Sequence, residues 1–208
     1  VWNVIQTLGE KLEKDEKELI EADKKEQIKG VREMPVLFEE ADGVWLNLQG
    51  KDRKRRHFPK AEMKAAIAYD GWAEEGSGRY RLDGKVVTAG FNKASDFQKI
   101  REAMIASEYN LDEVQMRFLN GDGASWIKKI RDKRTVFQLD PFHRNKSIRE
   151  NLSHKEAVCD VMELLEKEQI EEMFEYLTVY KDSLTDDTEI EKAETLLRYF
   201  TANKEGLL

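Results

Sequence analysis

The strongest indication of the fold is the segment Val36–Leu48, with the sequence VLFEEADGVWLNL. It predicts a β-strand, because it is largely apolar and strands place alternate side chains on opposite faces. This alternation puts Glu40 and Asp42 on one face and Glu39 on the other. A carboxylate inside such a run is costly to bury unless a cation or hydrogen-bond donors satisfy it. Alternatively, Asp42-Gly43 is a turn between two short strands, since Asp-Gly is a strong hairpin signal.

A second stretch of the same kind favours the strand over the turn. Residues 114–124 read VQMRFLNGDGA, which is again a strand-like run ending on Asp-Gly, at Asp122-Gly123. The segment that follows is helical in pattern, so we do not expect a hairpin there. Two acids at comparable positions of two strands, Asp42 and Asp122, therefore become the candidate site, with Glu40 as the rival of Asp42.

The composition is that of a soluble globular protein, with 37% charged and 40% hydrophobic residues among 208. No apolar run approaches the ~20 residues that span a bilayer, so we expect a cytoplasmic protein without a membrane partner. The one cysteine, Cys159, excludes an internal disulfide and fits a reducing compartment; its apolar neighbours predict a core position. The three histidines are scattered without ligand spacing, so a zinc site is not expected.

The charge is unevenly distributed along the chain. The net charge of −7 argues against a simple nucleic-acid binder, but residues 148–208 carry −9, which leaves +2 for the first 147 residues. Within that part, residues 51–60 (KDRKRRHFPK) hold six Lys or Arg side chains. Such a run is often a solvated loop. Its like charges nevertheless repel one another, and polyphosphate binding is a good reason to retain them.

The remaining patterns predict a mixed α/β fold. They predict a helix over residues 1–29, capped by Gly30, and then antiparallel strands over 61–72 and 79–92. A helix over 95–110 follows. After the strand that ends at Asp122 come a short helix over 124–133, with Trp126, Ile127 and Ile130 as its apolar side, and a strand over 135–139. This order implies a mixed five-stranded sheet with flanking helices, and the basic run becomes the loop between the first two strands. We therefore predict an N-terminal helix (1–30), a core (31–146) and an all-helical acidic lobe (147–208).

Acids on neighbouring strands of such a sheet suggest metal chemistry. Convergent carboxylates bind Mg²⁺ or Mn²⁺, because hard cations prefer oxygen ligands. Two such ions roughly 4 Å apart can activate water or a 3′ hydroxyl in phosphodiester chemistry. The basic run would then neutralise DNA phosphates.

The residues quoted above resemble the RNase H-like catalytic core of DDE transposases. Asp42-Gly43 lies on the first strand and Asp122-Gly123 follows the fourth, as in that family. The fifth strand runs into residues 140–145 (DPFHRN), which is similar to the Cys/Asp-x-x-His motif of the Mutator-like branch and related bacterial insertion sequences. The sequences of residues 118–127 and 137–143 look closest to a group of insertion-sequence transposases catalogued largely as an uncharacterised protein family.

The resemblance assigns roles to particular residues. Asp42 and Asp122 become the first two catalytic acids and ligands of two Mg²⁺ or Mn²⁺ ions, and Asp140 and His143 the family motif. The third acid, a Glu, follows the helical insertion in the family, so we expect it beyond residue 208; Glu191 and Glu194 are weaker substitutes. The residues expected to bind nucleic acid are Arg53, Lys54, Arg55, Arg56, His57, Lys60, Arg144 and Lys146.

Structural roles remain open for several of these residues. Asp122 would serve equally as a helix N-cap, the commonest role of Asp before a helical stretch. Asp140 would cap the next helix, and His143 would order it.

The function implied by the resemblance is DNA cleavage and strand transfer by a bacterial, nucleoid-associated transposase. It would act on transposon ends and target DNA as a homo-oligomer. One alternative is an RNase H-like nuclease or resolvase that cuts without joining. Another is a non-catalytic DNA- or protein-binding domain.

Overall fold

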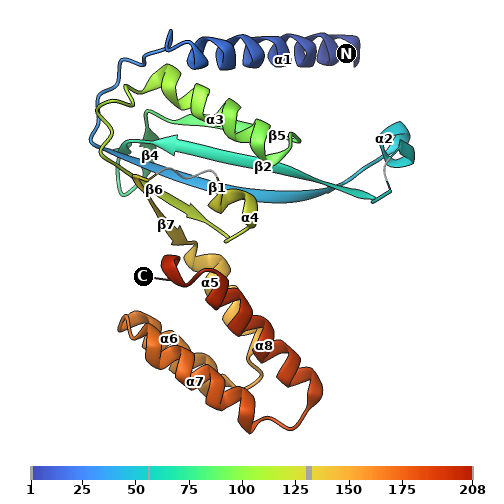
Figure 1. Ribbon diagram of the computed structural model, residues 1–208, viewed down its shortest axis with the longest axis vertical. Helices are drawn as coiled ribbons and strands as arrows, with labels where there is room; N and C mark the ends of the chain where they lie inside the picture. Colours follow the sequence, from blue (N-terminus) through green and yellow to red (C-terminus); the bar gives the residue numbers. More distant parts are fainter. Residues whose placement is uncertain (1, 56, 130–132, 208) are drawn as a thin grey trace. The chain divides into compact units, whose positions relative to one another are not determined.

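The computed structural model describes residues 2–55, 57–129 and 133–207 (Figure 1). The chain divides into two compact units. Unit 1 comprises residues 1–119 and 130–135, and unit 2 comprises residues 120–129 and 136–208. Each unit is described by itself.

The main sheet confirms the predicted mixed five-stranded arrangement. Its order is β5-β2-β1-β6-β7, with β1 antiparallel to β2 and β2 antiparallel to β5. The strands are β1 (Val36–Asn47), β2 (Lys60–Tyr69), β5 (Val86–Gly90), β6 (Met116–Gly121) and β7 (Thr135–Leu139). Numbered by their succession in the chain, these strands lie in the order 3-2-1-4-5, which is an RNase H-like arrangement.

The first strand is continuous through the Asp-Gly dipeptide. Within β1, Asp42 pairs with Ala65 and Gly43 with Lys64 of β2. The alternative of a hairpin turn at Asp42-Gly43 is therefore wrong. The predicted alternation is confirmed, since Glu39 is buried whereas Glu40 and Asp42 are exposed.

The second and third predicted strands are each divided in two. A separate hairpin of β3 (Gly71–Glu74) and β4 (Tyr80–Asp83) interrupts them. The division occurs at Asp70, whose backbone NH donates to the Asp83 carbonyl at 3.2 Å and whose carboxylate accepts from Arg32 Nε at 2.7 Å. A turn-forming residue with an arginine partner thus ends a strand that apolar periodicity alone would continue.

The helices of unit 1 are α1 (Trp2–Lys24), the short α2 (Gly50–Arg55) and α3 (Ala94–Glu108). Of these, α3 covers one face of the sheet, and α2 lies at the far end of β1 and β2. Figure 1 shows α3 over the sheet and α1 packed along α3. The buried cluster beneath α3 consists of Leu37, Ala68, Ile105, Tyr109 and Val114.

Gly30 does not cap the first helix as predicted. Helix α1 ends at Lys24, and the Gly30 NH instead donates to the Ala106 carbonyl at 2.8 Å. A Cβ on Gly30 would lie 2.1 Å from the backbone N of Tyr109. Glycine is therefore required here by the close approach of two backbones rather than by a helix end.

Unit 2 contains the predicted all-helical lobe. Its helices are α4 (Ser125–Lys128), α5 (Pro141–Asn151), α6 (Lys155–Glu166), α7 (Ile170–Ser183), α8 (Asp187–Ala202) and the 3-10 turn η1 (Lys204–Gly206). Trp126 and Ile127 are buried on α4 as expected, whereas Ile130 lies outside the described residues.

The predicted core position of Cys159 is wrong. Helix α6 buries Ala157, Val161 and Leu165, which recur at a spacing of four residues. Cys159 lies halfway between two of these positions, on the exposed side of the helix. Apolar neighbours in sequence were a poor guide to burial on this helix.

Candidate functional site

Asp42 presents its carboxylate at the surface of β1. The side chain is exposed, and its Oδ1 accepts the Gly43 NH at 2.7 Å. A Cβ on Gly43 would meet Glu62 Oε1 at 2.6 Å, so glycine allows the β2 side chain to lie close to the backbone here. An exposed carboxylate whose described partner is its neighbour's amide keeps oxygen atoms available for a cation.

The rival acid on the same face, Glu40, is engaged by a protein side chain. Its Oε1 accepts a hydrogen bond from the Tyr69 hydroxyl at 2.9 Å. Burial, together with this carboxylate, raises the pKa of Tyr69 far above its usual value, so the phenol remains a donor. The contrast favours Asp42 over Glu40 as the acid available to a ligand.

The sequence reasoning missed a buried charge cluster on the opposite face of β1. Glu39 is fully buried, and its carboxylate accepts from Arg117 of β6 through Nε at 2.5 Å and Nη2 at 3.1 Å. Arg101 of α3 also contacts Glu39 through Nη2. Glu102 completes the cluster, accepting from Arg117 Nη1 at 2.9 Å and from Arg101 Nη1 at 2.8 Å.

Two acids and two arginines thus neutralise one another inside unit 1. The requirement that a buried acid find a cation was a usable signal, since Arg101 lies on the apolar face of a predicted helix and Arg117 within a predicted strand. Sequence alone could not show that both arginines reach Glu39. A carboxylate held by two guanidinium groups stabilises structure rather than binding a metal.

Asp122 follows β6 directly and begins the loop to α4. Its Oδ1 accepts the Ala124 NH at 2.8 Å, which closes a short side-chain turn. The capping position of α4 is occupied by Ala124, so the helix N-cap role considered for Asp122 is wrong.

The end of α8 packs against this loop. The Tyr199 hydroxyl donates to the Asp122 carbonyl at 2.8 Å, and Asn203 Nδ2 donates to the Tyr199 carbonyl at 2.8 Å. Gly123 has φ +86°, and a Cβ there would lie 2.4 Å from Asn203 Oδ1. Burial, followed by the charges of Asp122 and Asp140, raises the pKa of Tyr199 to about 12. The backbone around Asp122 is therefore held by residues almost eighty positions away in sequence.

Asp140 and His143 form one linked pair at the start of α5. Asp140 is the N-cap, and its Oδ2 accepts the His143 NH at 3.1 Å and contacts the His143 Nδ1 at 2.7 Å. Burial alone would raise the pKa of Asp140, but the hydrogen bonds from His143, supported by Asn120, outweigh it and lower the pKa. The structural role considered for this pair is thus present.

His143 of this pair lines a pocket together with Asp122. This pocket, of about 260 Å³, is lined by Asp122, His143, Lys146, Ser147, Glu150 and Tyr199. Unit 2 therefore brings together one predicted catalytic acid, one family-motif residue and one predicted phosphate contact. Arg144 lies beside them in sequence and donates from Nε to Asn145 Oδ1 at 3.2 Å.

The basic run is not simply a loop as predicted, because residues 50–55 form α2. Arg53, Lys54, His57 and Lys60 are exposed, as phosphate contacts require. Arg55 belongs to α2, and Arg56 lies outside the described residues.

Within the described residues there is no group of three or more His, Cys, Asp or Glu side chains that could hold a metal ion. Asp42 belongs to unit 1 and Asp122 to unit 2. Their oxygen atoms are of the type that Mg²⁺ and Mn²⁺ prefer. Each carboxylate taken by itself therefore has donor chemistry that fits these ions.

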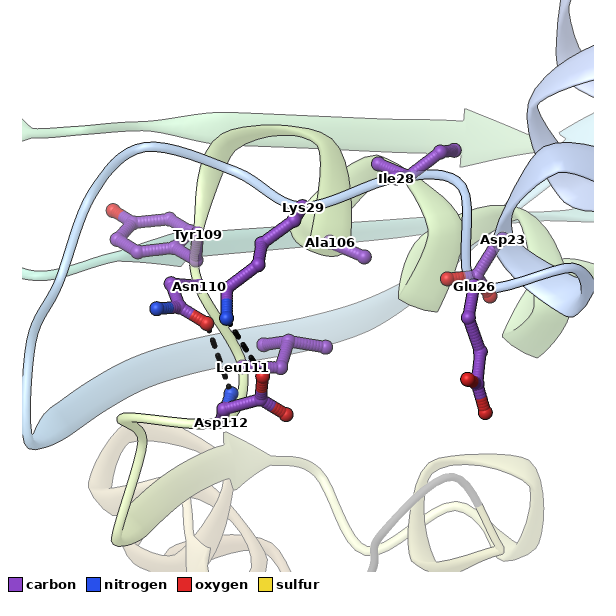
Figure 2. Close-up of a pocket in the computed structure, with 9 residues that line it drawn as sticks. All are labelled: Asp23, Glu26, Ile28, Lys29, Ala106, Tyr109, Asn110, Leu111 and Asp112. Atoms are coloured by element: carbon purple, nitrogen blue, oxygen red, sulfur yellow. Dashed lines mark hydrogen bonds and ion pairs between the residues drawn. The ribbon is translucent and has the colours of Figure 1, made fainter.

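A second pocket lies in unit 1, away from all predicted site residues. It measures about 350 Å³ and lies between the segment after α1 and the end of α3 (Figure 2). Figure 2 shows Lys29 reaching to Asp112, with which it forms an ion pair at 2.9 Å. This ion pair joins the segment after α1 to the segment after α3.

None of the helices described in Figure 1 is both long and apolar enough to cross a bilayer.

Comparison with known proteins gives a family and no structural neighbour. No solved structure matches the chain. Three UPF0236 proteins of Caldanaerobacter subterraneus subsp. tengcongensis are each 27% identical over 199 residues, which is 92% of this chain. The chain spans about 40% of the length of these relatives. Residues 3–208 match the uncharacterised protein family UPF0236, so the chain belongs to that family.

Proposed function

We propose that the chain is the RNase H-like catalytic part of a DDE transposase from a bacterial insertion sequence. It would serve divalent-metal-dependent cleavage of DNA and transfer of the cut strand. The observation that carries the proposal is the 3-2-1-4-5 sheet order, with exposed Asp42 on the first strand and Asp122 directly after the fourth.

The hydrogen bonds of the acids support this assignment. Asp42 and Asp122 accept from backbone amides one and two residues further along the chain, whereas Glu39 is saturated by two arginines. Asp42 and Asp122 would hold Mg²⁺ or Mn²⁺, which supplies activation of a water or 3′ hydroxyl when bound. Lys146, in the pocket with Asp122, would contact a phosphate of the DNA.

The relatives' names provide independent support. They join eleven, four and two locus designations of a single genome, respectively. Many copies of one coding sequence at scattered positions are what a mobile element produces. A transposase accounts for this multiplicity more directly than a housekeeping nuclease does.

The decisive experiment measures cleavage and joining of labelled insertion-sequence ends with Mn²⁺, using the whole protein as encoded. Asp42→Asn and Asp122→Asn are each expected to lower both activities by about 10²-fold or more, because each removes a charged metal ligand. The matched control is Glu40→Gln, on the same face of β1, which should keep activity because glutamine can still accept from Tyr69.

The two alternative functions predict different results in this assay. Cleavage without joining would make the protein a nuclease or resolvase of the same fold. DNA binding unchanged by Mn²⁺ and by Asp42→Asn, without cleavage, would indicate a non-catalytic binding domain and contradict the proposal.

A further inference from the structure

The joined ends of β1 and β2 form a ribbon, here named the β1–β2 arm and defined as residues 44–63. β5 accompanies β2 only as far as the Lys64–Gly90 pair, whereas β1 and β2 remain paired to Asn47–Lys60. Figure 1 shows the two strands running on together to α2, beyond the end of β5. The arm is therefore a two-stranded extension tipped by a short helix.

The arm exposes large apolar side chains that a solvated extension does not need. Trp45 is 62% exposed and Phe58 71%, and Val44 and Leu46 are also exposed. The His57 ring meets the Phe58 ring edge-on, with centroids 5.2 Å apart. A concentration of exposed aromatic groups on one projecting element marks an interaction surface.

Exposed cations lie among these aromatic groups. Lys51, Arg53, Lys54 and Lys60 are all exposed. Trp45 pairs with Glu62 and Asn47 with Lys60, so strand alternation places Trp45 and Lys60 on the same face of the ribbon. Glu62, the acid of that face, is neutralised by Lys64 at 3.0 Å. The surface is thus positive and aromatic together, although the whole chain carries −7.

This combination matches a single-stranded nucleic acid better than an acidic protein or a duplex. Cations bind phosphates of any nucleic acid, but an aromatic ring can stack only on a base whose face is exposed. Bases in a duplex stack on one another and leave no such face. Trp45 and Phe58 therefore gain contacts only when bases are unpaired.

We propose that the β1–β2 arm binds unpaired bases of a DNA strand, with Trp45 and Phe58 stacking on bases and Arg53, Lys54 and Lys60 holding phosphates. The choice of DNA rests on the proposed function, whereas the stacking geometry does not. Val44 and Leu46 share the face of Asp42 by strand alternation. Trp45 and Lys60 lie on the opposite face of the ribbon, so a strand stacked on Trp45 would not run along the face of that acid.

The test measures binding of chain 1–208 to labelled oligothymidine of about 15 nucleotides and to a duplex of equal length by fluorescence anisotropy, without divalent ions. Trp45→Ala should weaken oligothymidine binding about tenfold and change duplex affinity less than about twofold. Trp45→Phe should restore binding, because phenylalanine still stacks. The matched control is Tyr80→Ala, an exposed aromatic residue beside two arginines on the β3–β4 hairpin, which should change neither affinity.

The charge contribution is tested separately with Arg53→Gln combined with Lys54→Gln. This variant should weaken both ligands and reduce the salt slope for oligothymidine by about 1.4, since each phosphate contact contributes about 0.7. The proposal fails if the wild-type chain does not bind oligothymidine, if Trp45→Ala binds it normally, or if Trp45→Ala weakens both ligands equally. Thermal melts establish that each variant is folded. Because this experiment measures binding and not cleavage, its result can be interpreted even if the catalytic proposal fails.

Discussion

The two halves of β1 hold their acids in opposite ways. Beneath α3, Glu39 is buried and saturated by Arg101 and Arg117. Three residues later Asp42 is exposed, and its described partner is the amide of the next residue. One half of the strand therefore uses an acid to specify the core, whereas the other presents an acid to solvent.

Unit 2 repeats the contrast at shorter range. Asp140 is bound by both the backbone and the ring of His143, while Asp122 accepts from the Ala124 amide and borders a pocket. Among the described residues, a candidate catalytic acid is therefore distinguished by its lack of a strong cationic partner more than by its burial. Four substitutions test this contrast.

The largest effect is expected for Glu39→Ala. This change leaves two buried arginines short of an acid, so the free energy of unfolding should fall by about 3–5 kcal/mol. Urea denaturation measures it, with Glu40→Ala as the matched control on the exposed face. A loss below about 1 kcal/mol for Glu39→Ala would remove the distinction between the two halves of the strand.

Gly123→Ala should cost about 2 kcal/mol, because it combines a positive φ with contact against buried Asn203. Gly78→Ala is the matched control, since its φ is +77° and its Cβ would meet open space. Thermal or urea unfolding compares the two variants. Equal losses would show that Asn203 does not constrain the Asp122 loop.

Asp140→Asn should lower stability at pH 7 by about 1 kcal/mol, because asparagine can still cap the helix but loses the negative charge beside the helix N-terminus and His143. The pKa of Asp140 is lower in the folded state, so its ionisation stabilises the fold above the unfolded pKa of about 3.9. This contribution is lost as pH falls through the folded pKa. Unfolding at pH 7 and pH 3 should therefore show the difference from wild type shrinking at low pH, and a constant difference would contradict the assignment.

The smallest effect on stability is expected for Asp42→Asn. Because the side chain is exposed, the free energy of unfolding should change by less than about 0.5 kcal/mol. Calorimetric denaturation measures this, beside the cleavage assay described for the same variant. A large loss of stability would mean that Asp42, like Glu39, is a structural acid.

The sequence was sufficient for the architecture because its signals are local. Alternation along Val36–Asn47 predicted which residues share a face of β1, and the succession of strands and helices predicted a mixed five-stranded sheet and a helical lobe. Periodicity failed where a residue acts through a distant partner. Gly30 is explained by the α3 backbone and the end of β2 by Arg32, neither of which a local window contains.

The candidate site was accessible to sequence only in part. Repetition of Asp-Gly after strand-like runs drew attention to Asp42 and Asp122. The partners that distinguish these acids from Glu39 and Asp140 come from other elements, so they required the fold. Whether Asp42 and Asp122 bind metal and DNA stays a prediction for the experiments above.

The contact between α8 and the Asp122 loop has a practical consequence for dissecting the protein. Tyr199 and Asn203 supply part of the environment of Asp122, which precedes them by 77 and 81 residues. A fragment that ends before α8 would retain Asp122. It would lose the Tyr199 hydroxyl, which donates to the Asp122 carbonyl, and the Asn203 side chain, which packs beside Gly123. Minimal fragments for biochemistry should therefore extend through Asn203, and swapping the lobe between relatives should be expected to alter the acid loop as well.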